Sequence, residues 1–143
     1  MLTKVFTYGT LKRGLHNNHI IDESLVENIS EAKLEGYVLY YVSGGGFPLI
    51  VPEEGKVVHG ELFEFKTQDW EQQLERLDAL EGYNGKHNDS YNLYNRIKVN
   101  VIVDGEEIEC WVYEFNYKHN LRLIGERIED GNFLGPRQNR FSF

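Results

Sequence analysis

Glu81 stands where the apolar side of a predicted helix would place a buried residue. Trp70, Leu74 and Leu77 recur at steps of four and three, which is the spacing of side chains along one side of an α-helix. Glu81 is the next position on that side. In the last turn of a helix, loss of water and the partial negative charge of the free carbonyls both raise the pKa of a carboxyl. Such a carboxyl can accept and return a proton in one turnover, so Glu81 is the best candidate for a general acid/base.

A purely structural interpretation of this position stays open. Helix ends fray, and a shift of one residue in phase would turn the Glu81 side chain into water as an ordinary surface charge. Asp78 lies beside the apolar stripe, and we expect it to face solvent or to bond to a neighbouring loop rather than to carry chemistry. Periodicity by itself does not decide between the two roles of Glu81.

The second candidate is a glycine turn near the start of the chain, Tyr8-Gly9-Thr10-Leu11. Residues 4–8 are largely β-branched and aromatic and stop at Gly9, which predicts a strand that ends in a sharp turn. Because glycine lets the backbone approach closely, such a turn can present N–H groups to an anion or a carbonyl oxygen. The alternative is a plain turn at the end of a strand.

Other chemistries find little support in the sequence. His16 and His19 lie three residues apart, but no carboxylate or cysteine completes a set of ligands, so we expect no metal site. Cys110 falls on an apolar strand face and is expected to be a small buried hydrophobe rather than a nucleophile. The sequence contains no P-loop and no dinucleotide-binding fingerprint.

Composition and charge narrow the class of protein. The chain has 143 residues, 41% of them hydrophobic and 27% charged, which predicts one globular domain over residues 1–143. A net charge of −8 without a basic block argues against a nucleic-acid partner. No apolar stretch approaches the ~20 residues of a membrane span and we find no secretory signal, so we expect a cytoplasmic protein without a membrane partner. The composition does not indicate an oligomeric state.

Helices and strands must position the two candidates. A helix is predicted over residues 68–81, with Thr67 as N-cap, Asp69 in the first turn and Gly82 as the C-terminal stop. A weaker helix is expected within residues 17–32. Short strands are predicted at residues 4–8, 37–42 and 57–65, with loops at residues 44–48 and 52–55.

The clearest local signal is a hairpin within residues 96–115. Asp104 and Gly105 supply the two positive-φ positions that a type I′ turn requires. In the resulting register, Arg96 and Tyr113 pair on a polar and aromatic face that could line a site or meet solvent. The opposite face is predicted to be core and holds Ile97, Val99, Val101, Val103, Ile108, Cys110 and Val112.

Several short segments, taken together, resemble a known family. They are residues 5–12, 36–40, 46–48, 60–63, 77–83, 94–96, 111–113 and 128–133. In this order and spacing they resemble the γ-glutamylcyclotransferase-like family, and most closely its γ-glutamylamine cyclotransferase and AIG2-like branch. The likeness covers most of the chain rather than one motif.

The resemblance implies a fold, an activity and site residues. The fold is α+β, a small, mixed, mostly antiparallel β-barrel with flanking helices and a cavity at its mouth. The activity releases an amine or amino acid from a γ-glutamyl amide while the glutamyl part closes into 5-oxoproline, and it needs no cofactor. Glu81 matches the family's catalytic glutamate, and Tyr8-Gly9-Thr10-Leu11 matches the loop that holds the glutamyl moiety. Tyr113 is expected to be an extra hydrogen-bond donor to the substrate.

Three functions follow from these patterns. The leading one is cyclotransferase activity on a small γ-glutamyl substrate. A second is removal of a γ-glutamyl protecting group from a larger biosynthetic intermediate by the same cyclisation. A third is a binding module that keeps the cavity and senses a small carboxylate without turnover. Residues 85–90 form an insertion that could shape a different pocket, so the γ-glutamyl compound itself stays open.

Overall fold

The computed structural model describes residues 1–9, 11–12, 14–15, 17–44 and 46–135, which form one sheet with two helices and short 3₁₀ turns. The strands are β1 (Lys4–Thr7), β2 (Val26–Val42), β3 (Pro48–Phe65), β4 (Tyr94–Val103), β5 (Glu106–Phe115) and β6 (Ile124–Arg127). The helices are α1 (Trp70–Glu81) and α2 (Tyr117–Asn120), and the 3₁₀ turns are Asn18–Ile20, Glu23–Leu25 and Leu121–Leu123.

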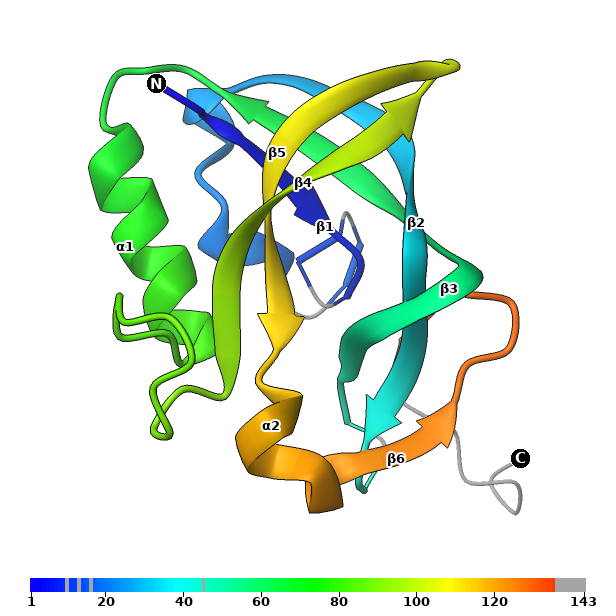
Figure 1. Cartoon of the computed structure of the whole chain (residues 1–143). Helices are drawn as coiled ribbons and strands as arrows, with labels where there is room; N and C mark the ends of the chain where they lie inside the picture. Colours follow the sequence, from blue (N-terminus) through cyan, green and yellow to red (C-terminus); the bar gives the residue numbers. More distant parts are fainter. Residues whose placement is uncertain (10, 13, 16, 45, 136–143) are drawn as a thin grey trace, which may run out of the picture.

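The sheet curves into a closed ring, with α1 on one side of it (Figure 1). The strand order is β3-β1-β5-β4-β2, and β2 pairs in turn with β3, so each strand of the ring has a neighbour on both sides. β1 and β5 are parallel, whereas the other pairs are antiparallel. The predicted α+β fold, with its mixed and mostly antiparallel sheet, is confirmed.

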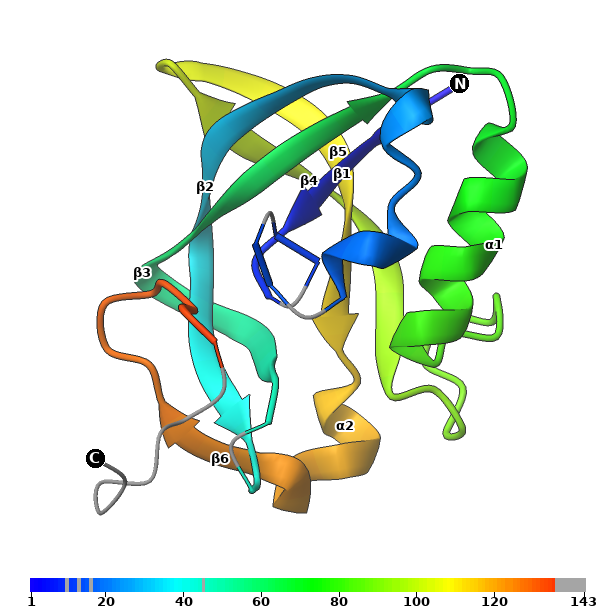
Figure 2. The ribbon, with the colours of Figure 1, turned by 180° about the vertical axis from the view of Figure 1, so that it is seen from behind.

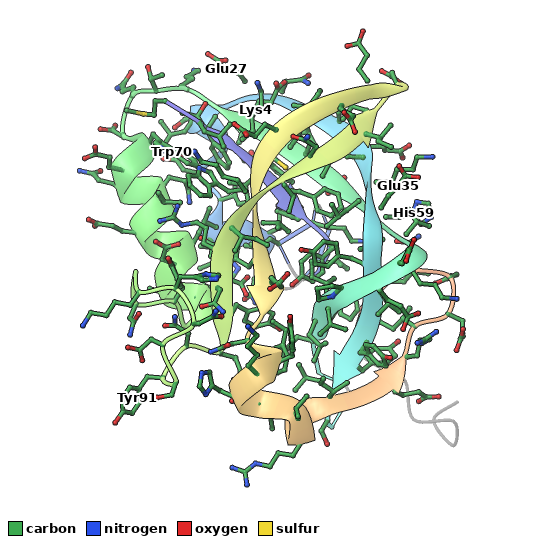
Figure 3. The ribbon with its side chains drawn as sticks, viewed as in Figure 1. Lys4, Glu27, Glu35, His59, Trp70 and Tyr91 are labelled. Carbon is green, nitrogen blue, oxygen red and sulfur yellow. The ribbon has the colours of Figure 1, made fainter. Side chains whose placement is uncertain are left out.

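The two faces of the sheet bury two separate parts of the core. Successive strand residues point to opposite faces, so Phe6 lies in the cluster inside the ring whereas Val5 lies in the cluster under α1. Trp70 anchors the first turn of α1 (Figure 3), and its ring lies 5.4 Å from that of Phe65. The inner cluster includes Leu34, Leu39, Ile50, Val58, Leu62, Val101, Cys110 and Val112.

The predicted hairpin is confirmed with its register. β4 and β5 meet at Asp104 and Gly105, whose φ angles of 49° and 82° suit a tight hairpin turn. Cys110 is fully buried inside the ring, as its place on the apolar face predicts. Arg96 pairs with Tyr113, and both side chains contact Asp78 near the end of α1, whereas Lys98 on the same face is exposed to solvent.

The helix that carries Glu81 is confirmed, but its predicted start is wrong. α1 begins at Trp70, and the residue before it, Asp69, has a left-handed φ of 56° and makes no side-chain cap. Thr67 is therefore not the N-cap, although its carbonyl accepts the Trp70 N–H at 3.3 Å. Gly82 ends the helix as predicted, because its φ of 67° is a conformation that glycine adopts without strain.

Two other expectations are wrong because pairing with distant residues overrides local pattern. Residues 17–32 form 3₁₀ turns and then the first part of β2, in which Ile29 lies opposite Phe63 of β3. Residues 52–55 continue β3 instead of forming a loop, although the β2–β3 pairing breaks its register there. The loop between β2 and β3 is present at residues 43–47, of which 43, 44, 46 and 47 are described.

Candidate active site

A cavity of about 240 Å³ opens beside the C-terminal end of α1. The end of α1 and the β2–β3 loop both contribute to it, and both lie in the lower half of Figure 1 and Figure 2, with the loop at the bottom. The end of β1, the turn after it, β4 and β5 complete the wall. The described lining residues are Phe6, Thr7, Tyr8, Gly9, Leu11, Asn17, Gly46, Phe47, Pro48, Leu80, Glu81, Leu93, Tyr94 and Tyr113.

Glu81 supplies the single charged side chain among the described lining residues. The residue is half-buried and lines the cavity. Burial raises the pKa of Glu81 from 4.5 to about 7. No hydrogen bond or ion pair joins this carboxyl to another described residue. Near neutral pH the carboxyl therefore holds its proton part of the time and has no competing partner among these residues.

The predicted glycine turn forms the wall beside Glu81, with Tyr8, Gly9 and Leu11 all lining the cavity. Thr10 lies outside the described residues. A Cβ on Gly9 would come within 2.6 Å of the Pro48 Cγ, closer than carbon atoms approach in proteins. The turn can therefore lie against the β2–β3 loop because its second residue has no side chain.

Tyr8 and Tyr113 are joined directly. The Tyr8 hydroxyl donates to the Tyr113 carbonyl at 2.6 Å, which ties the end of β1 to β5. Burial raises the pKa of Tyr8 well above its usual value, and the charge of Glu81 adds to this rise. The Tyr8 hydroxyl thus remains a donor at physiological pH and is committed to the backbone of β5.

Asp78, to which the sequence assigned no chemistry, fixes the end of α1 to the hairpin. Its Oδ1 accepts from the Tyr113 hydroxyl at 2.6 Å and from the Arg96 Nε at 2.9 Å. The Arg96 guanidinium lies over the rings of Trp111 and Tyr83, at 4.4 and 5.4 Å from their centroids. Asp78 is one helical turn before Glu81, so this contact also fixes the turn that carries the candidate base.

The proton of the Tyr113 hydroxyl is thus directed to Asp78 rather than into the cavity. Burial, followed by the hydrogen bond to Asp78, raises the pKa of Tyr113, which keeps the hydroxyl protonated. Tyr113 lines the cavity, but its expected role as a donor to substrate stays a prediction. Its ring and its contact with Asp78 shape the wall next to Glu81.

Tyr94 is a lining residue that sequence reasoning missed. Its hydroxyl donates to the Pro48 carbonyl at 2.6 Å and so holds the β2–β3 loop against the cavity. Tyr94 is buried, and its pKa is raised by burial and by the charge of Glu81. The segment 94–96 was among those that carry the family resemblance, but a contact with residue 48 leaves no local pattern in the sequence.

The described residues contain no group of three or more His, Cys, Asp or Glu side chains that could hold a metal ion. Within the same residues, no helix has the length and apolar character needed to cross a membrane. The chemistry available at the cavity is proton transfer by Glu81, next to a turn that lines the same cavity.

Comparison with known proteins gives one consistent result. The family model described as "Gamma-glutamyl cyclotransferase, AIG2-like" matches residues 5–134. The gamma-L-glutamyl-butirosin B gamma-glutamyl cyclotransferase of Niallia circulans is 31% identical over 115 residues, which cover 80% of this chain and 68% of that protein. AIG2-like protein A of Arabidopsis thaliana is 30% identical over 127 residues, covering 87% of this chain and 68% of the relative. The crystal structure of an AIG2-like protein from Mus musculus is similar with a TM-score of 0.67 and 26% identity, covering 97% of this chain and 99% of the mouse chain.

Proposed function

The chain belongs to the AIG2-like gamma-glutamyl cyclotransferase family, and we propose that it cleaves a γ-glutamyl amide into 5-oxoproline and a free amine or amino acid. One observation carries the proposal: the Glu81 carboxyl lies unpaired among the described residues, with a pKa of about 7, on the wall of a cavity that the glycine turn also lines. Relatives named for this activity support it.

The reaction needs one group that moves a proton between two nitrogens. Ionised Glu81 takes a proton from the α-ammonium of the glutamyl part, and the freed amine attacks the γ-carbonyl carbon. A new C–N bond closes the five-membered ring, and neutral Glu81 protonates the nitrogen of the amide that breaks. The ring nitrogen then loses its extra proton, and the released amine carries it away. Water is not consumed, so shelter of the site from solvent favours the reaction.

A carboxyl with a pKa of about 7 suits both halves of this exchange. At neutral pH a sizeable share of the protein molecules carries an ionised Glu81 carboxylate, which can accept a proton. The neutral carboxyl is acidic enough to donate that proton again. A fully solvated carboxyl with a pKa of about 4.3 would be a much weaker base. Burial of Glu81 therefore supports a catalytic role rather than a surface charge.

Substrate positioning falls to the turn of Tyr8, Gly9, Thr10 and Leu11. Ring closure requires the α-amine to lie about 3–3.5 Å from the γ-carbonyl carbon. A site that binds the flexible glutamyl chain in this folded conformation therefore lowers the activation barrier considerably. We propose that backbone groups of the turn bind the glutamyl moiety, because Tyr8, Gly9 and Leu11 line the same cavity as Glu81. The Tyr113 ring would form part of the cavity wall. When the hydrogen bond to Asp78 opens, the Tyr113 hydroxyl would be a hydrogen-bond donor to the substrate.

Removal of a γ-glutamyl protecting group from a larger molecule is the second candidate. The name of the Niallia circulans relative states that it acts on γ-L-glutamyl-butirosin B. The chemistry at Glu81 would be the same, and the amine part would extend from the cavity. A comparison of small and large γ-glutamyl amides therefore separates the two functions.

The direct test is formation of 5-oxoproline. The purified chain is incubated with γ-glutamyl-ε-lysine, γ-glutamyl-alanine and a γ-glutamylated aminoglycoside, and the products are separated by chromatography. We expect 5-oxoproline from at least one compound, and none above background from the Glu81→Gln variant. Activity that survives this substitution would exclude the mechanism. Tight binding of 5-oxoproline without any turnover would instead indicate a binding module.

A further inference from the structure

One lysine is buried next to the glycine turn, although no step of the proposed reaction uses it. Lys12 follows Leu11 directly, and it is the only charged residue that is buried among the described residues, with 9% of its surface exposed. Burial lowers the pKa of Lys12, and the negative charges of Glu61 and Asp130 oppose this effect. Because a buried ammonium group loses its water, it is stable only where protein atoms accept its hydrogen bonds.

The Lys12 side chain connects the glycine turn to the C-terminal part of the described chain. Its Nζ donates to the Phe133 carbonyl at 2.6 Å and to the Asn132 Oδ1 at 3.1 Å. The backbone N–H of Lys12 donates to the Gly9 carbonyl at 3.1 Å, which closes the turn. The same residue therefore closes the turn and attaches it to a segment 120 residues away in the sequence.

The segment that accepts these hydrogen bonds is itself fixed. Phe133 is fully buried in the cluster inside the ring, and its aromatic ring lies 6.1 Å from that of Tyr41. The Gly131 carbonyl accepts from the His59 N–H of β3 at 2.8 Å. This segment therefore gives the Lys12 side chain a rigid point of attachment.

Lys12 has no direct contact with the cavity. Tyr8, Gly9 and Leu11 line the cavity, whereas Lys12 lies in a second hollow together with Asn132. Burial alone accounts for the raised pKa of Glu81, without a contribution from the charge of Lys12. Lys12 therefore influences the cavity through the position of the turn.

We propose that Lys12 is a positioning residue, which holds the glycine turn in the conformation that binds the glutamyl moiety by attaching it to Asn132 and Phe133. This inference rests on the proposed function, because that function assigns the glutamyl moiety to the turn. A displacement of about 1 Å in groups that position a substrate can lower the rate by about 100-fold. Loss of the ammonium group should therefore weaken substrate binding and leave proton transfer by Glu81 intact.

The first test separates substrate binding from chemistry. Lys12→Met keeps most of the length of the side chain and removes its hydrogen-bond donors. With the γ-glutamyl compound that the wild type cleaves fastest, we expect KM to rise by about 10-fold or more. The apparent pKa of the kcat/KM profile should stay at about 7, because the burial of Glu81 does not depend on Lys12. An unchanged KM would overturn the proposal.

Two further variants assign the effect to the contact itself. The matched control is Lys66→Met, because Lys66 also donates to a backbone carbonyl, that of Ser24 at 3.0 Å, but is exposed and lies outside the described cavity lining. Its KM should equal that of the wild type. Asn132→Leu removes one acceptor and should raise KM by about 3-fold, with little further rise when it is combined with Lys12→Met. Effects on KM that multiply in the double variant would refute the assignment, and circular dichroism verifies that each variant is folded.

Hydrogen exchange tests the inference without turnover. The amides of Lys12 and Leu15 donate to the carbonyls of Gly9 and Lys12, both at 3.1 Å. In Lys12→Met these two amides should exchange about 10-fold faster, whereas the amides of α1 keep their wild-type rates. Equal acceleration along the whole chain would mean that Lys12 only adds to global stability, and it would overturn the proposal, as would unchanged exchange in the turn.

Failure of the proposed function gives a different result. If the wild-type chain forms no 5-oxoproline from any γ-glutamyl compound, cyclotransferase activity is excluded. Faster exchange confined to Lys12 and Leu15 would then still support Lys12 as the residue that positions the turn.

Discussion

Replacing Glu81 by glutamine should make the protein less active and, at alkaline pH, more stable. The folded chain binds the Glu81 proton more tightly than the unfolded chain, because burial raises the pKa from 4.5 to about 7. The bound proton makes its full contribution to the free energy of unfolding below about pH 4.5. This contribution is lost as the pH rises through about 7. A tenfold change in proton affinity is worth about 1.4 kcal/mol, so the loss amounts to at most about 3.5 kcal/mol.

Glutamine has nearly the same shape and cannot ionise, so the Glu81→Gln variant escapes this loss. The free energy of unfolding of both proteins is measured by urea denaturation at pH 5 and at pH 9. The difference between variant and wild type at pH 5 is then compared with the difference at pH 9. We expect the variant to gain up to about 3 kcal/mol relative to wild type between these pH values. Its turnover should fall by about 100- to 10,000-fold, the usual contribution of a general acid/base.

The matched control is Glu75→Gln, the same change on the exposed side of α1. This variant should retain wild-type turnover, because Glu75 is not among the described residues that line the cavity. If the stability difference between wild type and Glu81→Gln does not change with pH, the Glu81 carboxyl is solvated and the reasoning from burial is refuted. Loss of activity without that pH dependence would mean that Glu81 is needed for turnover although burial does not raise its pKa.

Further predictions concern the surroundings of the carboxyl. kcat/KM should rise with pH and level off above about 7 as Glu81 ionises, and a profile that stays flat from pH 5 to pH 9 would exclude it as the base. Asp78→Ala leaves two hydrogen-bonded side chains of the hairpin without their partner and should lower the free energy of unfolding by about 2–3 kcal/mol, measured by urea denaturation. Gly9→Ala forces a Cβ against Pro48 and should lower the melting temperature in calorimetry, with a cost of about 1–3 kcal/mol, and an unchanged melting temperature would contradict the close contact.

Local signals predicted the parts of the structure that depend on near neighbours in sequence. The hairpin followed from Asp104 and Gly105, which determine the turn and, through it, the register of both strands. Glu81 was found because three apolar residues of the same helix define the side on which it lies. Periodicity placed Glu81 on the core-facing side of the helix, but the cavity that it lines is completed by other elements.

Parts of the structure that depend on distant neighbours were not predictable in this way. The first half of β2 is a strand because it pairs with β3, for example Ile29 with Phe63, and its own pattern is weak. Asp78 gave no chemical signal because both of its partners lie on the hairpin, 18 and 35 residues away. The role of Tyr94 likewise depends on a carbonyl 46 residues away.

The position of β1 has a consequence for the order of assembly. This strand of four residues is paired on one side with residues 61–64 and on the other with Trp111. During synthesis the turn at residues 8–11 leaves the ribosome early, yet the strand before it gains its second neighbour only after β5 has emerged. Bringing together segments so far apart is slow, because a long loop must first be closed. The turn that lines the cavity is therefore synthesised among the first segments and fixed among the last, and a nascent chain that ends before β5 cannot complete the cavity wall.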